Sequence, residues 1–100
     1  MARVTLCRLD ELDDGRCTVF LDDGDAVLVV RSGGRLFAID GHCPHQYAPL
    51  EGGTIVNGVL ECPLHGWRFR LEDGQSPDMP MARVRTYAVD VVDGDVVIER

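Results

Sequence analysis

The stretch TIVNGVLEC, residues 54–62, predicts a tight β-hairpin between two loops that contain Gly and Pro. Asn57-Gly58 is a strong signal for a two-residue turn, and β-branched residues flank it on both sides. A hairpin returns the chain to the edge where it began. The stretch therefore predicts that GHCPHQYAPL at 41–50 and CPLHGWRF at 62–69 lie side by side at one end of the fold.

The rest of the chain predicts further short strands separated by turn residues. Apolar or alternating stretches occur at 3–7, 16–21, 26–30, 36–40, 67–71, 82–92 and 95–100. Asp93-Gly94 marks a second tight hairpin, and the polar segment 9–15 suits one helical turn or a loop. No segment has a long helical period. We therefore expect an all-β fold, a small sandwich or barrel of short antiparallel strands with two loops at one end.

Size and charge restrict the class of protein. A chain of 100 residues suits a single domain spanning 1–100. The net charge of −7 disfavours nucleic acid, whose phosphates require a basic surface. No apolar run is long enough to cross a membrane, and the first residues do not form a signal peptide. We expect a cytoplasmic monomer with neither nucleic acid nor a membrane as its partner.

The two loops contain four residues that bind transition metals. Cys43 and His45 lie in the first loop and Cys62 and His65 in the second, with sixteen residues between His45 and Cys62. Thiolate and imidazole together favour zinc, copper or iron–sulfur sites. The alternating order differs from a zinc finger, in which two cysteines precede two histidines. The pattern suits a 2Fe–2S centre with two Cys on one iron and two His on the other, and a structural zinc site is the alternative.

At this point the sequence resembles Rieske-type 2Fe–2S ferredoxins. CPH at 43–45 and CPLH at 62–65 match the two boxes of that family, and APLEGG and GWRF follow them as in the family. RLFAID, SPDMP and RTYAVDVVDGDVVIE resemble the framework, so the similarity covers nearly the whole chain. The resemblance implies a Rieske 2Fe–2S cluster held by loops at about 41–50 and 62–69. Cys43 and Cys62 would bind the inner iron, and His45 and His65 the outer iron.

Two departures from the family indicate which branch the chain resembles. Respiratory-chain Rieske proteins carry an extra cysteine in each box, where this chain has Ala48 and Leu64. They also have a hydroxyl residue at the place of Trp67. Fewer hydrogen-bond donors to the cluster sulfurs imply a lower reduction potential. The resemblance is therefore to the soluble, low-potential ferredoxins.

The implied function is electron transfer rather than catalysis. His42 is the one histidine left over, so a mononuclear iron site cannot be assembled beside the cluster. We expect a carrier that takes single electrons from a flavin-dependent ferredoxin reductase to a terminal ring-hydroxylating dioxygenase, with Arg68 and Arg70 at the rim of the docking surface. The alternatives are the small subunit of a cytoplasmic nitrite reductase and a zinc-stapled binding module.

The remaining candidate residues have structural interpretations. In an extended loop the side chain of His42 points away from that of Cys43, so we expect it to be no ligand. Cys7 and Cys17 lie in strand patterns, which predicts buried thiols. The prolines of SPDMP at 76–80 predict a stiffened third loop that covers the cluster.

Overall fold

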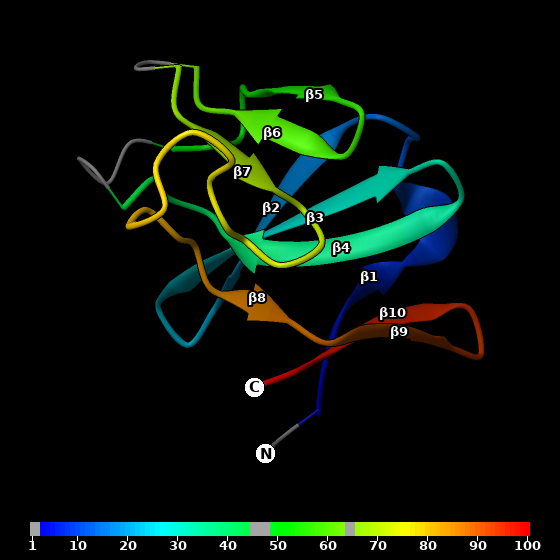
Figure 1. Ribbon diagram of the computed structural model, residues 1–100. Helices are drawn as coiled ribbons and strands as arrows, with labels where there is room; N and C mark the ends of the chain where they lie inside the picture. Colours follow the sequence, from blue (N-terminus) through cyan, green and yellow to red (C-terminus); the bar gives the residue numbers. More distant parts are fainter. Residues whose placement is uncertain (1–2, 45–48, 64–65) are drawn as a thin grey trace.

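The fold is built from short β-strands (Figure 1). A computed structural model describes residues 3–44, 49–63 and 66–100. Within these residues the strands are β1 (Arg3–Arg8), β2 (Cys17–Asp22), β3 (Asp25–Ser32), β4 (Arg35–Asp40), β5 (Thr54–Val56), β6 (Val59–Glu61), β7 (Arg68–Arg70), β8 (Thr86–Tyr87), β9 (Val89–Val92) and β10 (Asp95–Glu99). One 3-10 turn, η1 (Leu9–Glu11), lies in the polar segment where a helical turn or loop was expected. No helix in the described part of the chain has the length and apolar character to cross a membrane.

The strands form three sheets, and every pair of neighbouring strands is antiparallel. The central sheet has the order β2-β3-β4-β8. A second sheet, β5-β6-β7, lies above it in Figure 1, and a third, β1-β10-β9, lies below it. The prediction of an all-β fold of short antiparallel strands is confirmed.

The predicted hairpin at 54–62 is confirmed as β5 and β6. Ile55 pairs with Leu60, and Asn57 and Gly58 form the turn with φ of +51° and +76°. Positive φ at both central residues is the requirement of a type I′ turn, and Asn-Gly meets it with little strain. β7 then pairs with β6, so the segment after the second loop is held against the same hairpin.

The segment 82–92 is the main difference from the predicted strands, because it is not one strand. β8 pairs with β4 in the central sheet, whereas β9 pairs with β10 in the lower sheet. The residues before β8 belong to neither of these sheets. The Val84 N–H, for example, donates to the Gly74 carbonyl at 2.9 Å. An alternating pattern reports which residues are buried but not which sheet each residue joins.

The central strand β3 separates two hydrophobic cores. Val27, Leu28, Val29 and Val30 are all fully buried, so both faces of β3 are covered. Leu28 and Val30 belong to the core under β5-β6-β7, which we call the loop-side core. Val27 and Val29 belong to the core over β1-β10-β9, which we call the base core.

The two cores draw on different parts of the chain. The loop-side core contains Cys17, Leu28, Val30, Ile39, Cys43, Leu50, Leu60, Cys62, Phe69, Leu71, Ala82 and Val84. The base core contains Leu12, Val27, Val29, Ala38, Tyr87, Val96 and Ile98. The cysteines of both predicted metal-binding loops therefore lie in the same core.

Candidate metal centre

The first loop leaves β4 and is closed at its base by backbone hydrogen bonds. The Gly41 N–H donates to the Ala26 carbonyl, and the Leu50 N–H donates back to the Gly41 carbonyl, each at 2.9 Å. A Cβ on Gly41 would lie 2.8 Å from the Cβ of Ala26, so only glycine allows this close approach to β3. The loop therefore starts from a fixed point on the central sheet, two residues before Cys43.

The second loop lies between β6 and β7, and backbone hydrogen bonds join its described ends. The Cys62 N–H donates to the Trp67 carbonyl at 2.7 Å, and the Gly66 N–H donates to the Cys62 carbonyl at 3.1 Å. Gly53 places the two loops together, because a Cβ there would lie 2.6 Å from the carbonyl oxygen of Glu61. The hairpin prediction that set the two loops side by side is thus borne out for the described residues.

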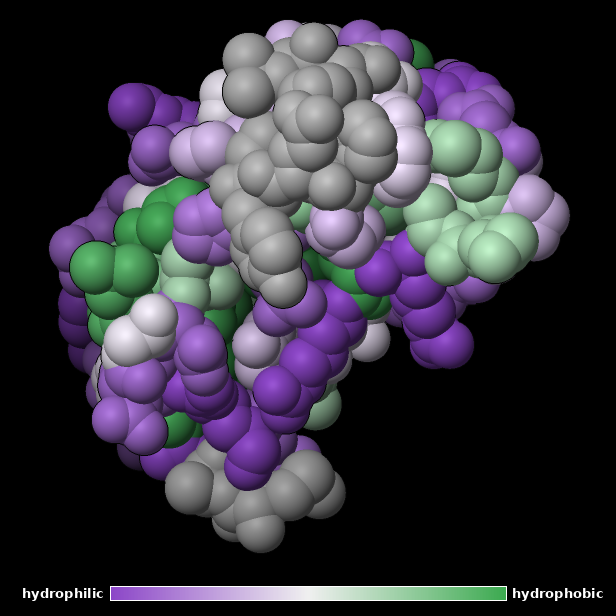
Figure 2. Space-filling model, turned by 90° about the vertical axis from the view of Figure 1, so that its left-hand side faces the viewer, coloured by the Kyte–Doolittle hydropathy of each residue, from purple (hydrophilic) through white to green (hydrophobic). Residues whose placement is uncertain are grey.

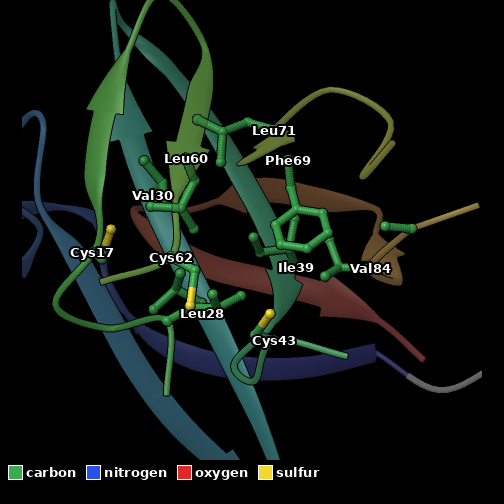
Figure 3. Close-up of a cluster of buried hydrophobic side chains, with 12 residues drawn as sticks. Cys17, Leu28, Val30, Ile39, Cys43, Leu60, Cys62, Phe69, Leu71 and Val84 are labelled. Atoms are coloured by element: carbon green, nitrogen blue, oxygen red, sulfur yellow. The ribbon is translucent and has the colours of Figure 1, made fainter. Parts of the chain in front are cut away.

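The two predicted cysteine ligands meet in the loop-side core. Cys43 is fully buried and Cys62 is 1% exposed. Figure 3 shows both sulfurs among the apolar side chains of this core. Two thiols brought together from two loops, in surroundings that exclude water, suit the inner half of an iron–sulfur site.

The two predicted histidine ligands, His45 and His65, lie outside the described residues, as do Ala48 and Leu64. His42 is described and is exposed, whereas its neighbour Cys43 is fully buried. The two side chains therefore point in opposite directions, which agrees with the expectation that His42 lies away from the metal.

A third loop, residues 71–83, lies beside the two metal-binding loops. Its residues Asp78 to Arg83 form one wall of a groove, and Pro44 and Trp67 form the other. The Ser76 hydroxyl is buried and accepts the N–H groups of Asp78 and Met79 at 3.3 and 3.2 Å. A third loop is therefore present at this end of the fold, as expected, and that it covers the cluster stays a prediction.

An ion pair that the sequence analysis missed joins this third loop to the second. Arg68 Nε and Nη2 donate to the two carboxylate oxygens of Asp78 at 2.8 and 2.5 Å. The Arg68 guanidinium holds the pKa of Asp78 below its ordinary value. The turn signal SPDMP at 76–80 located the loop, but nothing in the sequence pairs Asp78 with Arg68.

The two cysteines without histidine companions differ in burial. Cys17 is a buried free thiol in the loop-side core, and burial followed by the charge of Glu51 raises its pKa. Cys7 is a free thiol that is only partly buried against the base core, so the prediction of a buried thiol is wrong for Cys7. A raised pKa keeps a thiol protonated and unreactive, so the structural interpretation suits Cys17.

Comparison with known proteins identifies the family. The family model for the Rieske [2Fe-2S] domain matches residues 2–88. The ferredoxin component of the alkene monooxygenase system of Xanthobacter autotrophicus is 38% identical over 96 residues, which cover 95% of this chain and 79% of that protein.

Solved structures with the same fold come from two biochemical settings. The ferredoxin of carbazole 1,9a-dioxygenase from Nocardioides aromaticivorans has a TM-score of 0.89 and 36% identity, covering 98% of this chain and 97% of that one. A putative NADH-dependent nitrite reductase small subunit from Mycobacterium tuberculosis has a TM-score of 0.91 and 27% identity, covering 99% and 95%. A carbazole 1,9a-dioxygenase ferredoxin solved in complex with the oxygenase has a TM-score of 0.87 and 26% identity, covering 96% and 91%.

Proposed function

The chain belongs to the Rieske [2Fe-2S] domain family, and we propose that it carries single electrons to the terminal component of a ring-hydroxylating dioxygenase. The observation that carries this proposal is the meeting of Cys43 and Cys62 in one buried core at the end of a small domain. The ferredoxin components of oxygenase systems that match nearly the whole chain support it.

We propose four ligands for the family's cofactor, a Rieske 2Fe–2S cluster. Cys43 and Cys62 bind the inner iron through thiolates that the loop-side core shields from water. His45 and His65 bind the outer iron, at the positions of the family's two boxes. Two neutral imidazoles in place of two thiolates make the bound cluster a one-electron couple of higher potential than a four-cysteine site. A zinc-stapled module is set aside, because the family's cofactor is this cluster.

We propose two protein partners for electron transfer. A flavin-dependent ferredoxin reductase supplies the electron, and the terminal oxygenase receives it. Such complexes are small and short-lived, since a carrier must leave each partner after every transfer. We propose that residues 1–100 act as one domain, monomeric and cytoplasmic, and that the charge of −7 keeps the protein away from nucleic acid.

A second candidate function is the small subunit of a cytoplasmic nitrite reductase. The TM-score of 0.91 to a putative nitrite reductase small subunit supports this function, and it is similar to the score of 0.89 for a dioxygenase ferredoxin. In that setting the domain stays bound to a reductase instead of shuttling between two proteins.

The first test is the EPR spectrum of the dithionite-reduced protein, with iron and acid-labile sulfide measured on the same sample. We expect a rhombic spectrum with a low average g value and two irons with two sulfides. His45→Ala or His65→Ala should abolish that spectrum, whereas His42→Ala, the matched control in the first loop, should keep it. Loss of the cluster in His42→Ala with retention in His45→Ala would show that the ligand assignment is wrong.

A second measurement separates the two functions. Reduced protein is mixed in a stopped-flow instrument with the terminal oxygenase or with the sirohaem nitrite reductase from the same organism. Rapid oxidation by the oxygenase alone is the expected result. Rapid oxidation by the nitrite reductase alone would contradict the dioxygenase assignment and leave the cluster assignment intact.

A further inference from the structure

An apolar groove adjoins the metal-binding loops. It has a volume of about 620 Å³ and is lined by Pro44 and Trp67 of the metal-binding loops and by residues 78–83 of the third loop. Figure 2 views this end of the molecule, the left-hand side of Figure 1, and shows hydrophobic surface gathered near both sides of the face. The groove opens to solvent on the described surface, so a side chain of another protein can enter it.

The inner wall of the groove belongs to the two metal-binding loops themselves. Pro44 follows Cys43 directly, and the carbonyl of Trp67 accepts the hydrogen bond from the Cys62 N–H at 2.7 Å. A side chain of another protein that entered the groove would therefore contact residues bonded to both cysteine-bearing turns.

The outer wall is held in place before any partner arrives. The Arg68–Asp78 pair joins it to β7, and the Gln75 side-chain amide donates to the Pro80 carbonyl at 2.8 Å and the Ala82 carbonyl at 3.2 Å. Because these contacts fix the loop, little conformational entropy is lost when the groove is filled.

The side chain of Met81, on the outer wall of the groove, is exposed to solvent. Its exposed fraction is 98%, the highest among the exposed large hydrophobic residues described. A methionine side chain is flexible and polarisable, and it adapts to apolar partners of different shapes. Met81 lines the groove together with Trp67 and Met79, and contiguous apolar surface of this kind indicates an interaction site.

Arg83 adds a positive charge to the same groove, and its guanidinium makes no ion pair within the described residues. All ten arginines lie in the described residues. Six form ion pairs, Arg31 donates to a carbonyl, and Arg35 and Arg85 lie over aromatic rings. Only Arg83 has no such side-chain partner within that part of the chain.

The carboxylate whose pKa the charge of Arg83 helps to lower, that of Asp73, is already engaged. The pKa of Asp73 is lowered mainly by the hydrogen bond from the Gln75 N–H, and the charge of Arg83 contributes. The Asp73 carboxylate accepts this bond and two more from Arg70. Arg83 is exposed and lines the groove. Its planar guanidinium is suited to a carboxylate from another molecule.

We propose that this groove is the docking site for the terminal oxygenase, which inserts an apolar side chain between Trp67 and Met81 and places a carboxylate on Arg83. The inference rests on the proposed function and names the surface that serves it. Two observations support this occupant. The groove adjoins both cysteine-bearing turns, from which an electron would have to leave. Within the described residues it also offers the one arginine without a side-chain hydrogen bond, ion pair or ring contact, which suits a carboxylate of the partner. A related ferredoxin has been solved in complex with its oxygenase.

The test measures binding and electron transfer with the terminal oxygenase purified from the same organism. Met81→Ser and Arg83→Gln should each raise the Kd for the oxygenase about tenfold, since Met and Arg are enriched at such interfaces and a few residues carry most of the binding energy. Arg83→Gln should also change the dependence of the Kd on ionic strength. Both side chains are exposed, so the EPR spectrum and the rate of reduction by dithionite should be unchanged.

Two matched controls make the same chemical changes elsewhere. Val56→Ser alters a residue that is 61% exposed on the β5-β6 hairpin, and Arg16→Gln alters an exposed arginine in the loop after η1. Both should bind the oxygenase as the unaltered protein does. If the groove variants also bind like the controls while the unaltered protein passes electrons, the docking site is wrong and the proposed function stands.

Two other outcomes would overturn the proposal differently. If Met81→Ser and Arg83→Gln slow reduction by the flavin reductase but leave oxygenase binding unchanged, the groove serves the reductase instead. If the unaltered protein passes no electrons to the oxygenase, the proposed function itself fails.

Discussion

The two hydrophobic cores on either face of β3 are built in contrasting ways. The base core is made almost wholly by strand residues whose partners are set by sheet pairing, such as Val96 and Ile98 of β10. The loop-side core combines strand residues with Leu50, Leu71, Ala82 and Val84, which lie outside the strands.

The presence of sulfur is the second contrast between the cores. The buried members of the loop-side core include three cysteines, Cys17, Cys43 and Cys62, whereas those of the base core include none. Close packing of hydrocarbon can hold the base core together without any bound group. The loop-side core presents two thiols for the proposed cluster, so the stability of that half should depend on metal. We therefore expect the base core to be stable without a bound group and the loop-side core to depend on the proposed cluster.

The largest expected effect distinguishes the cysteines within the loop-side core. Cys62→Ser should abolish the Rieske EPR signal and the bound iron, because it removes a thiolate ligand. Cys17→Ala, the matched control in the same core, should keep two irons per chain. Iron and sulfide assays on both variants give the answer. Equal iron loss in the two variants would mean that the whole core, rather than the ligand, decides retention of the cluster.

A smaller effect compares two neighbouring valines of β3. Val29 faces the base core and Val30 faces the loop-side core, and both are fully buried. Truncation of either to Ala should lower the free energy of unfolding by about 2 kcal/mol, from two lost methyl groups and the cavity left behind. Urea unfolding measures this loss.

The rate of iron release to a chelator should separate the same two variants. Val30→Ala loosens the core that contains Cys43 and Cys62, so it should release iron faster than Val29→Ala. Equal release rates would indicate that the two cores are one cooperative unit with respect to the cluster.

The smallest effect concerns a polar contact at the edge of the base core. The Tyr87 hydroxyl donates to Asp40 at 3.0 Å. Burial, followed by the hydrogen bond to Asp40 and its charge, raises the pKa of Tyr87. In the unfolded chain the phenol ionises near pH 10, before it does so in the folded protein. Its contribution to stability is therefore complete below about pH 10 and is lost as the pH rises through the higher folded pKa.

Tyr87→Phe tests this pH dependence. At neutral pH the variant should be less stable by about 1 kcal/mol, the usual net value of one hydrogen bond. Above pH 10 the difference between the two proteins should shrink, as measured by urea unfolding at a series of pH values. A difference that is constant from pH 7 to pH 11 would contradict the assigned cause.

Local sequence patterns were sufficient for most strands, because strand formation and tight turns depend on neighbouring residues. Asn57-Gly58 located the hairpin that brings the two loops together, and its backbone has the expected positive φ values. The pattern failed at 82–92, where the chain leaves the central sheet after Tyr87 and joins the lower one. Sheet membership depends on hydrogen-bond partners distant in the chain, such as Ile39 for Thr86.

For the candidate site, the sequence identified residue types and spacing but not surroundings. Cys43 and Cys62 were predicted to come together, and the structure buries both in one core. His45 and His65 remain predictions. The Arg68–Asp78 pair and the groove beside Trp67 could not be predicted, because each joins residues ten or more positions apart through side-chain geometry.

The sequence by itself determined the strand-and-turn class of the fold, the four proposed ligands and the return of the second loop to the first. These follow from alternation, turn chemistry and the affinity of thiolate and imidazole for metal, all of which are local properties. Only the tertiary structure decided that β3 is covered on both faces, that the third loop is fixed beside the cysteines and that Arg83 has no side-chain hydrogen bond or ion pair within the described residues. Those features arise from packing between distant segments, and the order of residues along the chain does not encode such contacts one by one.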